Sequence, residues 1–425
     1  MRMLGLLSVL LLTVSCAGNG GPLWSFVDNG GGVGLNRSAL TDTFGLHLTS
    51  FQGGLALIHE EGGQVRVTLG RGFPIRWTAI DGGGAIGINK ANTATGPRIV
   101  SFNSKLYAAW DESGGVAQIR VAVYNGNPAA PVWSLVDGNG VNGLNKNPAR
   151  DARAPKFATF NGKLYLTWYE DTATVSQIRI AVFNGNDFAP SWTFVDGGGV
   201  NGINRDPIYN AQDPYLLTDG SRLYAAWDED NIDSQEQIRV AAYNGNDSSP
   251  SWAFVDGGGV SGLNRDALRF ASSAHLGRVG SHLYATWTES NGTSIQIRAA
   301  AFNGNLSSPS WSFVDGGGTT GLNSAGGGNA SNPQLAEFRS QLHATWTENA
   351  GFAGQVRVAR YNGTDGNPSW TFIEEKDRLG ISVDPINSSV QTPGMTVADS
   401  NGLYVGWGEV NLSGFSVVRL AVTRR

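Results

Sequence analysis

The chain has little charge and almost no cysteine. Charged residues make up 15% of its 425 residues, and Cys16 is the only cysteine. A single cysteine excludes an internal disulfide, so packing and hydrogen bonds alone must stabilise the fold. It also excludes a cysteine-based zinc cluster, and no two histidines stand at metal-ligand spacing. The formal net charge of −5 comes from interspersed acids and bases, without the basic stripe of a nucleic-acid-binding surface.

Helix-forming residues are scarce as well, whereas glycine is abundant at 59 residues and β-branched and aromatic residues are frequent. This composition is typical of an all-β protein with many turns. The hydrophobic fraction of 40% is enough for a large core and excludes a disordered chain.

The N-terminus differs from the rest of the chain. Arg2 precedes an apolar stretch, 4–14, that is too short to span a bilayer, and Cys16 follows it directly. This arrangement resembles the lipobox of bacterial lipoproteins, although Thr13 stands where leucine is usual. The resemblance implies a signal peptide at 1–15, a lipid on Cys16, a linker at 16–23, and a location in the bacterial cell envelope. The alternative is an ordinary cleaved signal peptide, in which Cys16 would have no role.

Tryptophans divide the remaining chain into repeats. Thirteen tryptophans form two interleaved sets, and within the first set the spacing is 53–60 residues. The first set is Trp24, Trp77, Trp133, Trp192, Trp252, Trp311 and Trp370; the second is Trp110, Trp168, Trp227, Trp287, Trp346 and Trp407. A period near 60 suits a four-stranded propeller blade with one long loop.

One repeat contains four strand patterns, which we name a, b, c and d. They lie at 155–163, 163–170, 177–186 and 191–199, and an Asn-Gly pair at the end of a and of c indicates a tight hairpin turn. The chain begins with an orphan strand d at 24–28 and ends with an orphan a-b-c set at 393–423. Pairing these pieces would close a ring and hide both sheet edges. The sequence therefore predicts a seven-bladed β-propeller over 24–425.

A segment such as QIRVAAYNGN (237–246) recurs in the repeats, each time with arginine in third place. Antiparallel register places Arg239 opposite Trp227 and Gln237 opposite Glu229. We expect the guanidinium to pack on the indole and to pair with Glu229, as part of the scaffold. Equivalent arginines in every blade cannot all converge on one substrate, so a functional role for them is disfavoured.

The c–d turns carry a family resemblance. GNDFAPSW (185–192), GNDSSPSW (245–252) and GTDGNPSW (363–370) resemble the Asp-box (BNR) repeats of sialidase-like propellers, in degenerate form. The repeat is also similar to those of uncharacterised bacterial lipoprotein propellers. In the Asp-box family the motif folds a turn on the face opposite the active site, so the resemblance implies a fold and no activity.

Catalytic residues are not apparent. The strand-b glutamates occur once per repeat, which suits structure better than acid catalysis, and His59 and His343 replace an aromatic residue of strand b. A sialidase needs a single Tyr–Glu pair and a single aspartic acid, and the sequence does not single out such a set. We therefore expect no catalytic residues and no enzyme.

The long d–a loops offer binding residues instead. DGGGVNGINRDP (196–207) and its copies share an aspartate, a glycine run that exposes backbone amides, and an asparagine. These side chains could cap the turns, bind sugar hydroxyls, or hold Ca²⁺ together with carbonyl oxygens. The candidate ligand-binding residues are Asp81, Asn89, Asp137, Asn145, Asp196, Asn204, Asp256, Asn264, Asp315 and Asn323.

The sequence thus predicts an exported, non-enzymatic binding or scaffold protein, lectin-like or protein-binding through its d–a loops. Its partner would be a glycan or an envelope protein, the chain would be a monomer, and it would need no cofactor unless Ca²⁺ binds in the loops. The alternative is a sialidase-like glycosidase acting at the central funnel.

Overall fold

The computed structural model describes residues 23–424, apart from 29–33, 85, 90–92, 139, 141, 198, 200, 258, 260, 317, 319, 325–327, 351–352, 375–379, 384–388, 391–392 and 399–401. The regular elements of this part of the chain are β-strands, and no described helix is long and apolar enough to cross a membrane. The predicted signal peptide and Cys16 lie outside the described residues.

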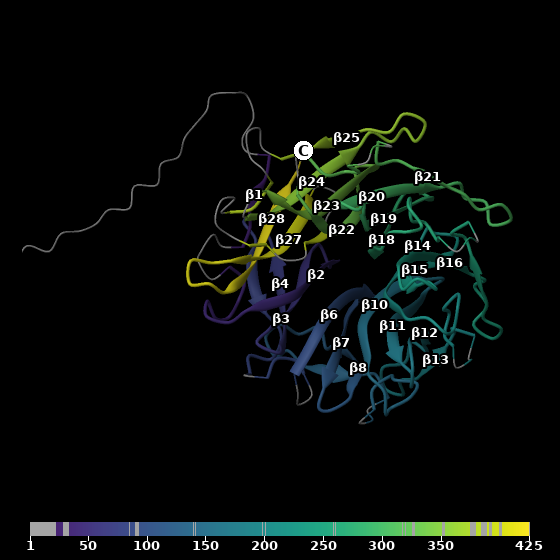
Figure 1. Ribbon diagram of the computed structural model, residues 1–425. Coiled ribbons are helices and arrows are strands. Elements are labelled where there is room, and N and C mark those ends of the chain that lie inside the picture. Colours follow the sequence, from purple (N-terminus) through teal and green to yellow (C-terminus); the bar gives the residue numbers. More distant parts are fainter. Residues whose placement is uncertain are drawn as a thin grey trace, which may run out of the picture.

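The strands form seven antiparallel four-stranded sheets, arranged as blades around a central axis (Figure 1). Blade 1 is β2 (Thr43–Phe51), β3 (Gly54–Glu61), β4 (Gln64–Arg71) and β5 (Arg76–Ala79). Blade 2 is β6 (Thr93–Phe102), β7 (Lys105–Ser113), β8 (Ala117–Tyr124) and β9 (Trp133–Leu135). Blade 3 is β10 (Ala152–Phe160), β11 (Lys163–Asp171), β12 (Ser176–Phe183) and β13 (Trp192–Phe194).

Blades 4 to 6 repeat this order, with strand a innermost and a short strand d outermost. Blade 4 is β14 (Ala211–Thr218), β15 (Leu223–Asp230), β16 (Glu236–Tyr243) and β17 (Trp252–Phe254). Blade 5 is β18 (Ala271–Val279), β19 (His282–Ser290), β20 (Ile295–Phe302) and β21 (Trp311–Phe313). Blade 6 is β22 (Ala330–Phe338), β23 (Gln341–Ala350), β24 (Ala353–Tyr361) and β25 (Trp370–Phe372).

Blade 7 joins the two ends of the chain. It contains β26 (Gly394–Ala398), β27 (Gly402–Val410) and β28 (Ser416–Thr423), and β1 (Ser25–Phe26) is its strand d. Ser25 pairs with Val422, and the side chain of Arg419 contacts Asp28 at 3.2 Å. The predicted closure of the ring is confirmed.

The hairpin registers are also as predicted. Trp227 pairs with Arg239 and Glu229 with Gln237 across β15 and β16. The a–b connection of blade 3 is a two-residue Asn161-Gly162 turn, in which both φ angles are positive, at 49° and 68°. The c–d connection differs from the prediction, because β12 ends at Phe183 and β13 begins only at Trp192. Its Asn-Gly pair starts a longer loop, which the Asn184 side chain closes by donating to the carbonyl of Ala189 at 2.8 Å.

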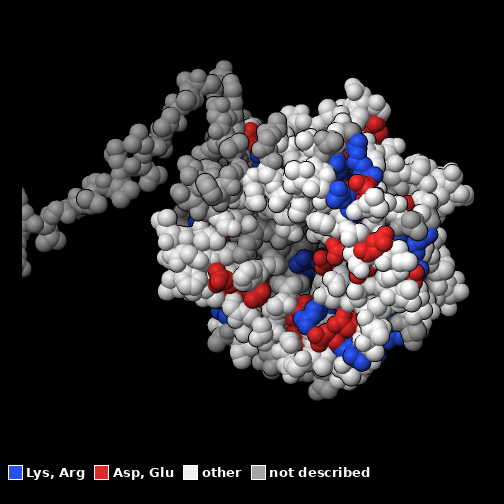
Figure 2. Space-filling model, in the orientation of Figure 1, with Lys and Arg blue, Asp and Glu red and all other residues white. Residues whose placement is uncertain are grey.

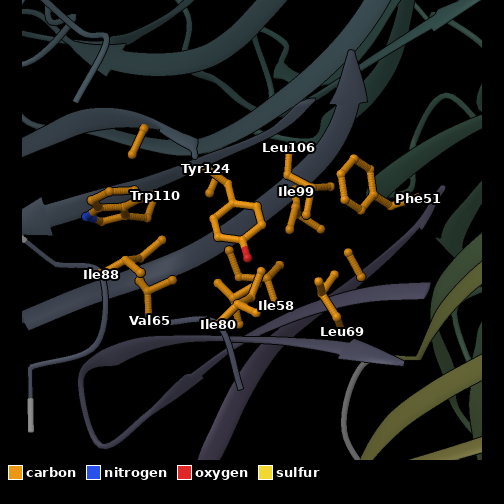
Figure 3. Close-up of a cluster of buried hydrophobic side chains, with 14 of the residues drawn as sticks. Phe51, Ile58, Val65, Leu69, Ile80, Ile88, Ile99, Leu106, Trp110 and Tyr124 are labelled. Atoms are coloured by element: carbon orange, nitrogen blue, oxygen red, sulfur yellow. The ribbon is translucent and has the colours of Figure 1, made fainter. Parts of the chain in front are cut away.

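Each blade packs on the next through apolar side chains. Figure 3 shows the cluster between blades 1 and 2, where Ile58 and Val65 of blade 1 lie with Ile99 and Trp110 of blade 2. The second set of tryptophans is fully buried in such clusters. The first set links the blades by hydrogen bonds, because each indole N–H donates to a backbone carbonyl of the preceding blade. These bonds run from Trp77 to Val27, Trp133 to Ile80, Trp192 to Val136, Trp252 to Val195, Trp311 to Val255, Trp370 to Val314 and Trp24 to Ile373.

Candidate functional site

In blades 1 to 5 the recurring arginine has a different ionic partner from the one predicted, whereas Arg357 of blade 6 contacts both the predicted Glu348, at 3.8 Å, and Glu374, at 2.7 Å. In blade 4, Arg239 contacts Asp256 at 3.4 Å and donates to the carbonyl of Gly259 at 2.9 Å. Glu229 instead accepts the indole N–H of Trp227 at 2.8 Å and the backbone N–H of Arg205. The aspartate at the end of strand d is therefore the counterion of the arginine. Equivalent pairs are Arg66–Asp81, Arg120–Asp137, Arg179–Asp196 and Arg298–Asp315.

The loop asparagines serve the same scaffold. Asn204 accepts the backbone N–H of Ile178 at 2.9 Å and donates to the carbonyls of Ser176 and Tyr209. A Cβ at Gly202 would lie 2.1 Å from the Ile178 oxygen, so glycine is required where the loop crosses strand c. Equivalent bonds join Asn89 to Val65, Asn145 to Ile119, Asn264 to Ile238 and Asn323 to Ile297.

The predicted ligand-binding residues are thus distributed over the loops of five blades and are not brought together in one site; they are buried, except for the half-buried Asn145 and Asn204. Asp137 and Asn145 border a cavity of about 220 Å³ beside Trp168. Within the described ranges, no group of three or more His, Cys, Asp or Glu is placed to hold a metal ion.

A bulge in strand a creates a site that the repeat pattern conceals. In the first six blades the a–b register shifts at one place, for example between Gln212 and Tyr215 in β14, around a residue with positive φ, Asp213. The residue that resumes the pairing faces the central funnel and is different in almost every blade. In blades 1 to 6 these residues are His47, Arg98, Lys156, Tyr215, His275 and Gln334, and the equivalent residue of blade 7 is Gly394.

A second variable position lies on strand b, just before the repeated glutamate. Its residues are Glu60, Asp111, Tyr169, Asp228, Thr288, Thr347 and Gly408. Acidic and aromatic residues fall in blades 1 to 4, and small neutral residues fall in blades 5 to 7. The chemistry of the funnel is therefore asymmetric although its scaffold is repeated.

We call the seven strand-a residues that resume the pairing, His47 to Gly394, the strand-a ring. Its first six members line one cavity of about 510 Å³. Figure 2 shows acidic and basic side chains around the central opening, gathered on the side formed by β6–β16. The ring of Tyr215 lies against that of His275, with centroids 4.0 Å apart. We call these six residues with Asp213 the funnel cluster.

Two cations of the funnel cluster affect each other. Burial, and after it the nearby charge of Arg98, lower the pKa of Lys156 to about 7. The carboxylates of Asp213, Asp111 and Asp228 oppose this shift. At neutral pH, Lys156 can therefore both take up and release a proton, while an arginine keeps its charge.

The histidines of the cluster are neutral. Burial lowers the pKa of His275 to about 3 and that of His47 well below its usual value. Nδ1 of His275 accepts the backbone N–H of Leu335 at 3.2 Å, so in the neutral ring the proton is on Nε2. Burial also raises the pKa of Tyr215 to about 12, which keeps its hydroxyl protonated at neutral pH.

Two buried carboxyls hold the bulges behind the cluster. Asp111 accepts from the Thr95 hydroxyl and from the backbone N–H of Ala154. Asp228 accepts the backbone N–H of Ser273 at 2.9 Å, and burial together with Asp213 raises its pKa well above the usual value. These carboxyls position the inner strands of neighbouring blades.

The sequence prediction missed this cluster because it compared strands b and c, whose residues repeat. A signal was present in strand a, where Gly96-Pro97-Arg98, Ala154-Pro155-Lys156 and Asp213-Pro214-Tyr215 align. The residue after the proline differs between these blades, although the surrounding sequence pattern is the same.

Solved structures share this fold. An ulvan lyase of polysaccharide lyase family PL25, bound to -[GlcA(1-4)Rha3S]-, matches with a TM-score of 0.60, 10% identity, and coverage of 89% of this chain and 93% of that chain. The polysaccharide lyase Uly1 matches with a TM-score of 0.58, 11% identity, and coverage of 89% of each chain. An α-L-arabinanase of Penicillium chrysogenum, complexed with arabinobiose, matches with a TM-score of 0.47, 15% identity, and coverage of 77% and 92%.

No protein-family model and no curated protein matches the chain. Membership of the Asp-box family is therefore not shown, and what the solved structures share with this chain is the propeller fold.

The prediction of a non-enzymatic binding or scaffold protein is wrong. It depended on finding no asymmetric residues at the funnel, and the funnel cluster is such a set. The solved structures that match this fold with a TM-score above 0.5 include polysaccharide-cleaving enzymes.

Proposed function

We propose that this protein is a carbohydrate-active enzyme that cleaves an acidic polysaccharide in its central funnel by a lyase reaction. The observation that carries the proposal is the strand-a ring. Six blades of one repeated scaffold place His, Arg, Lys, Tyr, His and Gln around a single cavity. A purely structural position would repeat from blade to blade, as the buried arginine of strand c does.

The cluster fits β-elimination at a uronate residue. Arg98 neutralises the carboxylate, which acidifies the proton on the adjacent carbon. The neutral amine of Lys156 takes that proton, because its pKa of about 7 leaves much of it unprotonated at neutral pH. The released electrons form a carbon–carbon double bond as the glycosidic C–O bond breaks. The Tyr215 hydroxyl then protonates the leaving oxygen, and His275 holds the phenol ring in place.

The fold comparisons support the same class of substrate. The polysaccharide lyases that match this chain are aligned over 89% of its length, and one of them is bound to a polymer that contains glucuronate. A propeller of this fold can therefore hold a polysaccharide that contains glucuronate, and the cations of this funnel would bind its carboxylates.

A glycosidase is the second candidate, because of one specific observation. Burial and the nearby Asp213 raise the pKa of Asp228 well above its usual value, so two carboxyls of unequal acidity lie together beside the funnel. Hydrolysis would need such an acid together with a second carboxylate. The product distinguishes the two reactions, because only elimination leaves a carbon–carbon double bond.

Export of the protein from the cell would suit this function, because a polysaccharide does not cross a membrane and its enzyme must meet it outside. We propose that the protein works in the bacterial cell envelope, held there by a lipid on Cys16. The Asp-box-like c–d turns would then form the face opposite the catalytic funnel.

The test is a screen of uronate-containing polysaccharides, both polyuronates and polymers with neutral units, monitored by ultraviolet absorbance of the unsaturated product and by reducing ends. Elimination gives both signals and hydrolysis gives only the second. Lys156→Met should abolish elimination, whereas Lys163→Met, on an exposed ion pair with Asp247, should leave it unchanged. Cleavage without ultraviolet absorbance would favour the glycosidase, and full activity of Lys156→Met would refute the proposed base.

A further inference from the structure

A second cavity of about 560 Å³ lies between blades 6, 7 and 1. Its wall includes Phe44 of β2, Ser331 and Asn332 of β22, and Asn349 of β23. None of the described residues that line this cavity is ionisable. It therefore differs from the funnel cluster, which is rich in charged and titratable groups.

The lining has the composition of a site for an uncharged sugar. Phe44 is a large hydrophobic residue with 47% of its surface exposed, so its ring is free to stack on another group. The same cavity is lined by the amides of Asn332 and Asn349 and the hydroxyls of Ser331 and Thr347, which can donate to and accept from sugar hydroxyls. The hydroxyls of Ser331 and Thr347 already contact each other at 2.8 Å, which orders that part of the wall.

Glycines keep the funnel open on this side. Gly394 occupies the seventh position of the strand-a ring, and Gly408 occupies the seventh position on strand b. A Cβ at Gly394 would meet its nearest atom at 3.5 Å, so the local packing does not require glycine there. The blade-7 position of the strand-a ring therefore adds no side chain between blades 6 and 1.

Asn332 joins the two cavities, because it lines both of them. It is the bulge residue of β22, with φ of +54°, and its equivalents in blades 1 and 2 are Gly45 and Gly96. A chain bound in the funnel cluster can therefore continue past Asn332 toward Phe44.

We infer that the cavity of blades 6, 7 and 1 is a subsite for an uncharged sugar unit adjacent to the uronate in the funnel cluster. The inference rests on the proposed function and specifies its substrate as a polymer in which an acidic unit neighbours a neutral one. A sulfated or carboxylated unit would be disfavoured in this cavity, because the described lining offers no cation to replace its hydration.

Binding can be measured apart from catalysis by titrating the Lys156→Met protein with neutral gluco-, xylo-, arabino- and rhamno-oligosaccharides, and with an oligogalacturonate. We expect at least one neutral oligosaccharide to bind. Phe44→Ala should weaken it by roughly tenfold, the upper range for loss of one stacking contact. Asn332→Gly removes the amide and keeps the positive φ that glycine accepts in blades 1 and 2, so it should weaken binding without unfolding the blade. Phe188→Ala is the control, because Phe188 is 99% exposed in a c–d turn.

The inference is overturned if no neutral oligosaccharide binds, or if Phe44→Ala and Asn332→Gly bind as tightly as the parent. Failure of the proposed function gives a different result. In that case the wild-type protein cleaves no uronate-containing polysaccharide, while the neutral oligosaccharide still binds and still depends on Phe44.

Discussion

At the scale of single residues, the funnel derives its chemistry from groups that the inner strands force together. Lys156 and Arg98 are on neighbouring blades, and each would be fully protonated and solvated in the unfolded chain. In the fold, burial and the Arg98 charge together lower the pKa of Lys156 to about 7. The same arrangement that attracts a carboxylate therefore also produces a base.

The first prediction concerns this coupling. If neutral Lys156 is the base, kcat/KM should rise with pH through about 7, because deprotonation activates the enzyme. Arg98→Met removes a neighbouring cation, so the pKa of Lys156 should rise. The rising part of the pH profile of kcat/KM should then move to higher pH. The shift can also be followed without activity, by NMR titration of ¹³C-methylated lysines assigned with Lys156→Met. A Lys156 signal that titrates at the same pH in both proteins would contradict the coupling.

The residue types of the funnel cluster could have been found by aligning the sequence repeats. That these residues meet at one cavity could not. Aligning the strand-a segments places Arg98, Lys156 and Tyr215 in one column. The bulge residue is Gly, Ala, Asp, Ser or Asn in different blades, and the proline that follows it in blades 2, 3, 4 and 6 is absent from blades 1 and 5, so the register shift leaves no mark that all six blades share. That these positions meet at one cavity follows only from closure of the ring.

At the scale of elements, hydrogen bonds of the d–a loop connect strand c of one blade to strand b of the next. In blade 4, Asn264 binds back to Ile238, and the following Arg265 and Asp266 donate their backbone N–H groups to Glu289 of blade 5. The sequence predicts the loop residues as ligand contacts because exposed amides and aspartates are common in binding loops. The sequence could not show that the polar side chains of the loop are already hydrogen-bonded to backbone groups within the protein.

The second prediction tests whether the hydrogen bonds of the d–a loop stabilise the fold. Asn264→Ala leaves the buried N–H of Ile238 without its acceptor and the carbonyls of Glu236 and Arg269 without a donor. The free energy of unfolding should fall by about 1–3 kcal/mol. Urea denaturation measures this, with Asp233→Ala in the exposed b–c turn of the same blade as the control. Equal stability of the two variants would show that Asn264 does not stabilise the loop. Asn264 would then again be a candidate ligand-binding residue.

At the scale of the whole molecule, seven blades form a ring whose ends are joined only by non-covalent contacts. The period of the tryptophans predicts the number of blades, and the orphan strands at the two termini predict the closure. Both follow from sequence because each repeat can be recognised separately. The seam consists of the pairing of β1 with β28, the ion pair of Asp28 with Arg419, and the indole bond of Trp24 to Ile373.

The last prediction is that covalent closure of this seam stabilises the whole ring. Ser25 and Val422 are direct antiparallel partners, so Ser25→Cys with Val422→Cys can form a disulfide in a Cys16→Ser background. Ala242→Cys with Ala253→Cys is the matched control, because these residues hold the equivalent c–d positions within blade 4. The seam disulfide encloses nearly the whole chain and the control encloses only one turn. Chain entropy therefore favours the seam disulfide by about 3 kcal/mol in the free energy of unfolding.

Guanidinium denaturation of the oxidised and reduced forms of both proteins measures that difference. A larger gain at the seam, together with a slower unfolding rate, would mean that separation of β1 from β28 precedes loss of the blades. If both disulfides give the same gain and unfolding is not slowed, the ring opens elsewhere. The interface between blades 6 and 7 would then be the next place to test, because the glycines that open the funnel lie in blade 7, beside that interface.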